Sequence, residues 1–520
     1  MNEEKMAKTP RLPGKALAAL PMLALLVIML LNFFLEWGQD AHIPVMIAAA
    51  IAIVVGKICG WSYQDMLTGA VSTLSRSMEA ILILFCIGTL IGAWIYSGTI
   101  ASIVYYGLFA ITPKLFLPIA CIICAIVGIS IGSSWTTVGS VGIAFMAIGE
   151  SLGFSSELVA GMLISGAYCG DKLSPLSDTT NLAAASAQTG LFDHVRAMVS
   201  TTFPSFIIAL IIYTVIGLGA ADSYDPTLAN GLQDAMKNHY AFMNPILILP
   251  VLVIIGACIF KVPAIPGIML ATVTGLALAM IFQGTSFVDC ITAVHYGFEI
   301  DPAELTVSSS VTTDPAAVEE IQALAGELLN RGGMNSMLWT INLVIIAVAF
   351  GGILEKVGCV ESLLGGLMRR ARKPFGAVLV TLVTSAVCDW TMGDQYLAIV
   401  IPGQMYQKKF DELGLGRNML SRSLEDLGTL WSPLCPWNSC GAFQSSTLGM
   451  SCFAYFPYAF MNMINPIYAL VTSALGRNIL YADGSKVGLL SGKIKPGTAP
   501  QAPEEGKAIA LAALKAQRGE

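Results

Sequence analysis

The sequence predicts an all-α polytopic membrane protein made of two inverted repeats, with re-entrant hairpins and broken transmembrane helices. Three observations support this fold class. The 520 residues are 55% hydrophobic and only 12% charged, which is typical of a chain that crosses a bilayer many times. Polar motifs that contain proline interrupt the apolar segments, and similar motifs recur about 260 residues later in the same order. Lysine and arginine gather on one set of loops.

Apolar stretches of about 20 residues, the length that crosses a bilayer core, define the expected spans. The first stretch follows a basic N-terminal segment, 1–15. It is long enough to span and lacks a small-residue cleavage site, so we interpret it as a span and not as a signal peptide. The expected spans are 16–35, 41–59, 79–97, 157–187 (broken), 197–219, 244–260, 264–282, 335–354, 418–446 (broken) and 449–475.

Segments 115–149 and 375–406 have a different pattern, in which a polar tip separates two apolar arms of about 16 residues. A helix of 16 residues rises about 24 Å, less than the bilayer core of about 30 Å. We therefore expect re-entrant hairpins with tips at 132–137 and 388–395 near mid-membrane. Four short or tilted spans are the alternative. Segments 99–111 and 358–370 predict helices along the membrane surface.

The charge distribution predicts the topology and the domains. With the N-terminus cytoplasmic, the inner loops hold most of the lysine and arginine, whereas 283–334 holds eight acidic residues and one arginine. The third span then runs outward and its copy, 335–354, runs inward, so the halves are inverted. The expected parts are a first transmembrane half (16–282), an external acidic loop (283–334), a second-repeat region (335–475) and a cytoplasmic tail (476–520). The tail is expected to be partly disordered, with at most a short helix at 506–517.

The most informative stretch is Gly-Asp-Lys-Leu-Ser-Pro-Leu-Ser-Asp-Thr-Thr-Asn at 170–181. Ionisable side chains at membrane depth cost several kcal/mol and normally face a pathway or a partner. Pro175 cannot donate a backbone hydrogen bond, so a helix is expected to break there. Non-helical backbone at that depth is tolerated only where it is buried or lines a cavity. The freed carbonyls, hydroxyls and carboxylates are hard oxygen ligands that suit a small cation.

An internal duplication is indicated by three motif pairs in the same order. Each match is weak alone, but interrupted helices in corresponding positions of two halves point to a transporter's binding site. The pairs are Gly92…Gly98…Ser102 with Gly352…Gly358…Ser362, Gly132-Ser133-Ser134-Trp135 with Gly393-Asp394-Gln395-Tyr396, and Gly170-x-x-x-Ser174-Pro175-Leu176 with Gly428-x-x-x-Ser432-Pro433-Leu434.

Carboxylates are the first candidates for ion binding. Asp178 has no basic neighbour in sequence, so it is favoured as the exchanging group, whereas Asp171 has an ion pair with Lys172 as its alternative. In the second half the corresponding tip residue is Asp394. The candidate site residues are Ser133, Ser134, Thr137, Asp171, Ser174, Ser177, Asp178, Thr179, Asn181, Asp389, Asp394, Ser432 and Asn438; the sodium candidates are Asp178, Asp171 and Asp394.

Other charged and metal-binding residue types have structural interpretations. Arg422 lies three and four residues before Glu425 and Asp426, a spacing that predicts an ion pair on a helix. Glu79 and Glu150 stand at the ends of apolar segments, where interfacial solvation accounts for them. Hydroxyls at 133–137 can bond back to helix carbonyls. The isolated pair Cys121-x-x-Cys124 and four scattered histidines do not predict a metal or redox site.

Three segments resemble the NhaC family of sodium/proton antiporters: 170–181, Gly-Asp-Gln-Tyr-Leu-Ala-Ile-Val-Ile-Pro-Gly at 393–403, and Ser-Pro-Leu-Cys-Pro-Trp-Asn-Ser-Cys-Gly at 432–441. The resemblance covers roughly 16–475. It implies an inverted-repeat homodimer in the cell membrane, with re-entrant hairpins and broken helices around a central site. Trp431 and Cys435 depart from the family pattern. The family also includes exchangers of malate and lactate, so it does not fix the substrate.

The expected function is secondary active transport, not catalysis. The chain would exchange cytoplasmic Na⁺ for external H⁺ by alternating access, with both ions competing for Asp178, Asp171 and Asp394. The sequence lacks the nucleotide-binding pattern Gly-x-x-x-x-Gly-Lys-Ser/Thr, so an ion gradient is the expected driving force, with no cofactor and no nucleic-acid partner. The alternatives are a passive channel and a Na⁺- or H⁺-coupled carrier of a small organic acid or amino acid. The anionic group of such a substrate would meet helix N-termini near Ser174 and Ser432.

Overall fold

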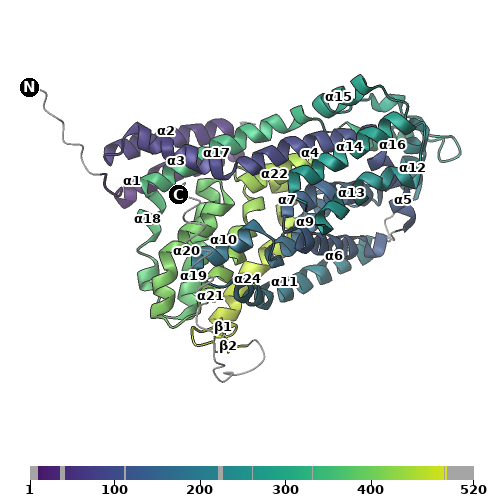
Figure 1. The fold of residues 1–520 in the computed structure, drawn as a ribbon. Coiled ribbons are helices and arrows are strands. Elements are labelled where there is room, and N and C mark those ends of the chain that lie inside the picture. The colour runs from purple at the N-terminus through teal and green to yellow at the C-terminus, as the bar shows by residue number, and fades with distance from the viewer. Residues whose placement is uncertain are drawn as a thin grey trace, which may run out of the picture.

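The computed structural model describes residues 10–35, 41–110, 113–220, 226–260, 262–330, 332–484 and 486–488, and helices form nearly all of this part (Figure 1). The helices up to residue 282 are α1 Lys15–Phe34, α2 His42–Ile58, α3 Tyr63–Arg76, α4 Met78–Tyr96, α5 Thr99–Ala110, α6 Pro113–Ile131, α7 Ser134–Thr137, α8 Ile143–Ser151, α9 Ser156–Leu173, α10 Asp178–Ala187, α11 Leu191–Ala220, α12 Pro226–His239, α13 Leu249–Ile259 and α14 Ala264–Phe282.

The helices that follow are α15 Phe287–Tyr296, α16 Pro315–Leu329, α17 Leu338–Val357, α18 Cys359–Leu364, α19 Pro374–Met392, α20 Gln395–Glu412, α21 Arg417–Leu424, α22 Ser439–Leu448, α23 Cys452–Tyr455 and α24 Phe460–Ala474. Two π-helical segments are η1 Val138–Gly142 and η6 Glu425–Thr429. The 3-10 segments are η2 Pro245–Ile248, η3 Pro302–Glu304, η4 Met334–Met337, η5 Met368–Arg370, η7 Ser432–Leu434 and η8 Phe456–Tyr458.

Five described helices are long and apolar enough to cross a membrane: Pro113–Ser130, Leu191–Gly219, Ile265–Phe282, Met334–Val357 and Pro374–Met392. The chain is therefore an all-α polytopic membrane protein. Both α6 and α19 have 19 residues, more than the expected arms of about 16 residues, and both are among these candidate spans. Whether they cross or re-enter stays a prediction.

Both predicted helix breaks are present. The first separates α9 from α10 at Ser174–Ser177, around Pro175. The second lies in 425–438, where a π-helical turn and a 3-10 turn separate α21 from α22. Residues in these breaks leave backbone groups outside the helical hydrogen-bond pattern, which frees them for other partners.

The duplicated motifs adopt matching local conformations. Gly98 and Gly358 end α4 and α17 at the same φ of +77°. Gly132 and Gly393 have φ of +73° and +65°, and each precedes an extended residue that caps the next helix. These positive φ values favour glycine because other residues meet steric strain there. The match supports a duplication, and the inverted relation of the halves stays a prediction.

Helix α9 packs closely on α6 through glycine. A Cβ at Gly166 or Gly170 would collide with the backbone carbonyl of Cys121 or Ala125 on α6. Small residues four apart let two membrane helices bring their backbones together. This close contact holds the end of α9, and with it the first break, against α6.

Several helices were not predicted from the sequence. The segment 283–334, expected as a loop, contains α15 and α16, and α3 and α12 are also additional. The helix α3 begins with a capping box, because the side chains of Ser62 and Asp65 bond each other's backbone N–H groups. The described part of the tail contains a two-stranded antiparallel pair, β1 Ile479–Leu480 with β2 Lys486–Val487. The helix expected at 506–517 lies outside the described residues.

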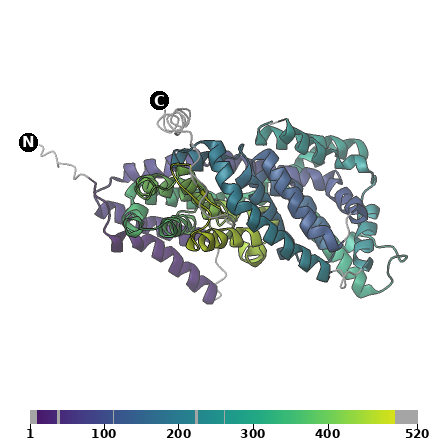
Figure 2. The same cartoon turned by 90° about the horizontal axis from the view of Figure 1, so that it is seen from below.

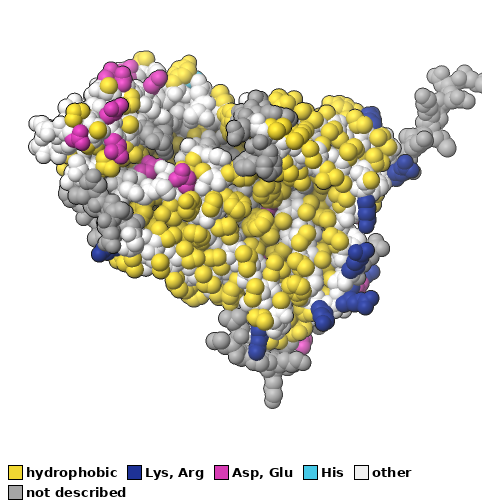
Figure 3. Space-filling view, turned by 180° about the vertical axis from the view of Figure 1, so that it is seen from behind, with side chains coloured by type: hydrophobic (Ala, Val, Ile, Leu, Met, Phe, Trp, Pro, Cys, Tyr) yellow, Lys and Arg dark blue, Asp and Glu magenta, His cyan; other side chains and the backbone are white. Residues whose placement is uncertain are grey.

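The molecule is elongated, and its two ends differ in charge. Figure 2 shows the N-terminal helices in purple and the teal helices of the acidic segment at opposite ends. In Figure 3, lysine and arginine gather at one end and acidic side chains at the other, with a largely hydrophobic face between them. An apolar belt between polar ends is the surface expected for a protein surrounded by lipid.

Candidate functional site

A cavity of about 790 Å³ lies where both tips and both broken helices meet. Figure 1 shows α7, α9 and α22 close to one another in the middle of the bundle. The sequence predicted this convergence because isolated polar tips are costly in lipid. The polar lining residues are Arg76, Ser77, Glu79, Ser130, Ser133, Ser134, Thr136, Asp171, Ser177, Asp178, Thr179, Asn181, Asp394, Gln395, Tyr396, Ser439 and Cys440.

Of the two predicted sodium candidates in the first half, Asp171 is buried and Asp178 is exposed. Asp171 lies in the last turn of α9 and is 5% exposed. Its Oδ2 accepts hydrogen bonds from the backbone N–H of Ser134 (3.1 Å) and from the Ser134 hydroxyl (2.7 Å). Its Oδ1 has no hydrogen-bond partner in the described part of the chain. The first tip therefore fixes one carboxylate oxygen and leaves the other for a cation or a proton.

Asp178 begins α10 on the other side of the break and is exposed to the cavity. The positive end of a helix dipole favours an anion at this position. Next to it, the hydroxyls of Ser177 and Thr179 are 3.0 Å apart. The Asn181 side chain donates to the backbone carbonyls of Pro175 and Ser177. Asn181 thus stabilises the break, and Asp178 offers its charge to the cavity.

The second tip carries a carboxylate that also has a structural role. Asp394 caps α20, because its Oδ1 accepts from the backbone N–H of Leu397 at 3.0 Å. Its Oδ2 accepts from the Ser77 hydroxyl at 3.2 Å. Both oxygens thus have partners, in contrast to Asp171. The corresponding residue of the first tip, Ser133, caps α7 in the same way.

Asp389 and Asn438 form a pair that is not part of the cavity lining. Asp389 is fully buried near the end of α19, and its Oδ1 accepts from the Asn438 side chain at 3.3 Å. Asn438 in turn caps α22 by accepting from the backbone N–H of Cys440. The helix N-terminus in the second half therefore lies at Ser439, so the expectation that it lies near Ser432 was wrong. The second break is longer than the first, which moves the start of the helix along the chain.

Three predicted site hydroxyls bond to the backbone. Thr137 donates to the carbonyl of Ser133, Ser174 to that of Ile129, and Ser432 to that of Thr429. Hydroxyls that bond back to helix carbonyls are common in apolar surroundings. In the first half the helix N-terminus lies at Asp178, with Ser177 as its N-cap residue, close to Ser174 in sequence.

Glu79 was assigned to the membrane interface from the sequence, but the structure places it in the cavity wall. No local sequence motif predicts that Glu79 lines the cavity, because most of the other residues of this wall come from distant parts of the chain. Arg76, one helical turn earlier, also lines the wall and bonds Glu355 at 2.7 Å. The wall thus contains one acidic side chain beyond those predicted, and Arg76 already has a partner.

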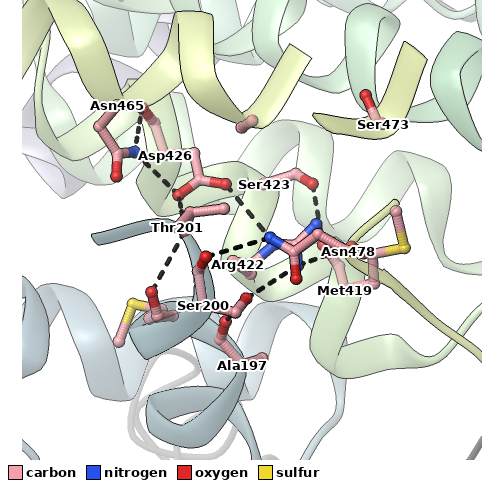
Figure 4. A network of polar contacts seen from close by, with 12 residues as sticks. Ala197, Ser200, Thr201, Met419, Arg422, Ser423, Asp426, Asn465, Ser473 and Asn478 are labelled. Atoms are coloured by element: carbon pink, nitrogen blue, oxygen red, sulfur yellow. Dashed lines mark hydrogen bonds and ion pairs between the residues drawn. The ribbon is translucent and has the colours of Figure 1, made fainter. Parts of the chain in front are cut away.

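A buried network of charges joins the two broken helices through Lys172 and Asp426. Figure 4 shows its part around Asp426 and Arg422. Asp426, in η6, accepts on Oδ1 from Lys172 (2.6 Å), Thr201 (2.7 Å) and Asn465 (2.9 Å). Its Oδ2 lies 3.6 Å from Nε of Arg422, which confirms the ion pair predicted from their spacing. Both side chains of the Lys172–Asp426 pair have zero exposure.

The alternative interpretation of Asp171, an ion pair with Lys172, was wrong. Neighbours in sequence point to different faces of a helix, so Lys172 reaches Asp426, which is 254 positions away. Asp171 is left to face the cavity. This difference removes the structural alternative for Asp171, which stays a candidate ion ligand.

The geometry defines a polytopic membrane transporter with an acidic cavity between broken helices. The described residues contain no group of three His, Cys, Asp or Glu side chains that could hold a metal ion. Carboxylates, hydroxyls and break carbonyls supply the oxygen ligands that hard cations prefer. The model of the Na⁺/H⁺ antiporter family matches residues 15–180 and 166–477, and the chain belongs to this family.

Curated relatives support the same assignment. The Na⁺/H⁺ antiporter NhaC of Alkalihalophilus pseudofirmus is 34% identical over 438 residues, covering 84% of this chain and 90% of the relative. The malate-2H⁺/Na⁺-lactate antiporter of Bacillus subtilis is 33% identical over 467 residues, 90% of this chain and 96% of the relative. The arginine/ornithine antiporter ArcD of Halobacterium salinarum is 33% identical over 477 residues, 91% of this chain and 94% of the relative.

Proposed function

We propose that this chain exchanges cytoplasmic Na⁺ for external H⁺ by alternating access. The observation that carries the proposal is Asp171: it is buried, held on one oxygen by Ser134, and has no hydrogen-bond partner in the described residues on its other oxygen. Such a carboxylate can bind a sodium ion, and a proton that neutralises the same local charge would compete with that ion. Asp178 adds a second charge on the same cavity wall.

The two ions exclude each other because each neutralises the same negative charge. A sodium ion at Asp171 and Asp178 would complete its shell with hydroxyls such as those of Ser134 and Ser177 and with carbonyls freed by the break. Asp394 is a third charge in the wall, but its oxygens are both bonded, so we assign it a supporting role. Empty return of the carrier would leave a buried charge uncompensated, which is costly.

A coupled carrier of a small organic acid or amino acid is the second candidate. The cavity volume of about 790 Å³ exceeds the need of a bare ion, and two relatives are named for malate, lactate, arginine or ornithine exchange. The charges of the cavity wall favour some of these substrates over others. Glu79, Asp171 and Asp178 would repel a dicarboxylate, and Arg76 is already bonded to Glu355. Within this class the wall favours a substrate that carries positive charge.

The proposed location is the cell membrane, as a multi-pass protein with both termini cytoplasmic and with a homodimer as its assembly. The charged ends of Figure 3 support an axis through the bilayer. The test is transport in proteoliposomes. We expect a sodium pulse to drive a proton flux that saturates with sodium, and no comparable flux with malate or lactate. Malate-driven flux without a response to sodium alone would replace the proposal by the carrier.

A further inference from the structure

Glu425 and His194 form a buried pair behind the cavity. Glu425 Oε1 lies 4.0 Å from His194 Nε2, both side chains have zero exposure, and neither atom has a hydrogen-bond partner in the described residues. The other polar atom of each side chain has a hydrogen-bond partner. The Thr429 hydroxyl donates to Glu425 Oε2 (2.5 Å), and the Ser421 hydroxyl lies 2.7 Å from His194 Nδ1.

Two buried polar atoms that face each other without a hydrogen-bond partner can be joined by one shared proton. Leaving one such atom without a partner costs about 1–3 kcal/mol. A distance of 4.0 Å is slightly too long for a hydrogen bond and too short for a water molecule in line between them. A movement of about 1 Å, with one proton on either atom, would join the pair by a hydrogen bond. The smallest occupant of this site is therefore a proton.

The charges around the pair leave room for one cation. Lys172 of α9 and Arg422 of α21 are positive, whereas Asp171 of α9 and Asp426 and Glu425 of η6 are negative when ionised. With His194 of α11 neutral, one negative charge remains uncompensated. The neutral amide of Asn465 is the group that α24 turns toward Asp426.

Three other acidic groups on helices packed around η6 are not counted with these charges. Asp178 of α10 and Asp394 of α20 line the cavity, and Asp389 of α19 bonds Asn438. We therefore assign the uncompensated charge to the cluster of Asp171, Lys172, Arg422, Glu425 and Asp426, in which Asp171 also lines the cavity. Both Asp171 and Lys172 act electrostatically on Glu425, so the cavity and the pair sense each other's charge.

Building on the proposed sodium–proton exchange, we propose that Glu425 and His194 form the binding site of the exchanged proton, separate from the sodium ligand Asp171. The proton sits between Glu425 Oε1 and His194 Nε2, and a sodium ion sits at Asp171. Either one neutralises the cluster, and both together would leave a positive charge in the interior. The two ions therefore compete through charge and not by occupying the same oxygen.

The experiment measures the KM for sodium between about pH 6 and 9 in proteoliposomes of the full chain, from sodium-driven proton flux and from radioactive sodium counterflow. One competing proton raises the KM of the unmodified protein about tenfold per pH unit in the acidic range. Glu425→Gln places a neutral side chain of similar shape at this position, so it mimics protonated Glu425 at every pH. We expect a KM that is high and independent of pH, with proton flux lost.

His194→Gln should act in the opposite direction, because it keeps the charge of Glu425 and removes the proton's acceptor. We expect its KM to stay low at acidic pH, where that of the unmodified protein rises. Glu361→Gln, an exposed glutamate of α18, is the matched control and should keep the unmodified slope. A purely structural role would reduce the maximal rate in both variants without moving the pH dependence.

Two outcomes separate this inference from the proposed function. If the unmodified protein moves no protons in response to sodium, the proposed function fails, and this site fails with it. If it does, and both variants keep the slope of log KM against pH, only the separate proton site is overturned. If Glu425→Gln does not fold, as judged by size-exclusion chromatography, His194→Gln decides alone. A KM for sodium below that of the unmodified protein at acidic pH supports the separate proton site, and an unchanged or higher KM overturns it.

Discussion

Asp171 and Asp178 differ in their surroundings although both face one cavity. Asp171 has one oxygen bound by the first tip, whereas Asp178 is exposed at the start of α10. Their spacing of seven residues would put them on one face of an unbroken helix. The break instead makes one the end and the other the beginning of a helix. Their shared cavity follows from the break and not from helical periodicity.

Asp178→Asn should abolish sodium-driven proton movement while the protein still inserts and folds. The change keeps the shape of the side chain and removes the charge that a sodium ion meets in the cavity. The exposed position at the helix start predicts a small cost in stability, about 0.3–1 kcal/mol. Sodium-induced pH change in proteoliposomes measures the effect, with size-exclusion profiles as the folding control. Unimpaired exchange by a well-folded variant would remove Asp178 from the mechanism.

Lys172→Met should destabilise the protein strongly, because it leaves Asp426 as a buried charge with one partner fewer. Breaking a fully buried pair costs about 3–5 kcal/mol. Arg417→Met is the matched control, since Arg417 bonds Asp411 in a partly exposed pair that contributes about 1 kcal/mol or less. The stabilities of the two variants are compared by the midpoint of thermal unfolding in detergent.

The same experiment tests the assignment of partners. Adding Asp426→Leu to Lys172→Met should recover part of the lost stability, because the pair is then replaced by apolar groups. Equal melting of Lys172→Met and Arg417→Met would contradict the buried network. Sequence neighbours could not reveal this pair, since the partner of Lys172 lies in the other half of the chain.

The sequence predicted the broken elements well and the short elements poorly. Pro175 and Pro433 lie in the two breaks, where proline cannot donate an interior helical hydrogen bond. Proline alone does not predict a break, because Pro402 and Pro466 lie inside continuous helices. Helices α12 and α16 were missed because a search for 20-residue apolar spans passes over amphipathic helices. Their start signals are present nonetheless: Asp314 caps α16 and is followed by Pro315. Glu79 could not be placed, since no rule of local sequence brings α4 to the break.

Gly132→Ala should destabilise the first tip and impair transport. A Cβ there would lie 2.6 Å from the carbonyl carbon of Leu176 and 2.7 Å from the nitrogen of Ser177, in a residue with φ of +73°. Gly153→Ala is the matched control, because Gly153 has φ of +80° and no heavy atom within 4 Å of the added Cβ. The left-handed conformation alone costs about 1–2 kcal/mol.

The difference between the two variants isolates the contact between the tip and the break. We expect Gly132→Ala to lower the unfolding midpoint further than Gly153→Ala and to weaken sodium affinity, since residues 176–178 must shift. The two midpoints and the KM for sodium are the measurements. Equal midpoints with unchanged affinity would show that the tip does not press on the break.

At the scale of the whole molecule, the charge pattern predicted the axis before any contact was known. The acidic helix α16 and the basic segment after α18 lie at opposite ends of the molecule (Figure 1). Charge counting succeeds here because it depends on composition over whole loops. It cannot describe how the acidic segment folds, which depends on caps and on packing between α12 and α16.

The topology prediction is tested by cysteine labelling in a cysteine-free background. A cysteine at Ser309, which is exposed, should react with an impermeant reagent from outside intact cells. A cysteine at Arg372, also exposed, should react only after permeabilisation; the neighbouring Ala371 is unsuitable because it is 5% exposed. Protection of position 309 with labelling of position 372 would reverse the orientation.

The Lys172–Asp426 pair has a consequence for how the protein is made. The two residues are 254 positions apart, and ribosomes add about 5–20 residues per second. Lys172 therefore waits about 13–50 s for its partner after it leaves the ribosome. An unpaired lysine at mid-bilayer costs about 2.5–3.5 kcal/mol on insertion scales. During biogenesis α9 must thus be sheltered, by the insertion machinery or by water, until η6 arrives, and a chain truncated before η6 should be a substrate for membrane proteases.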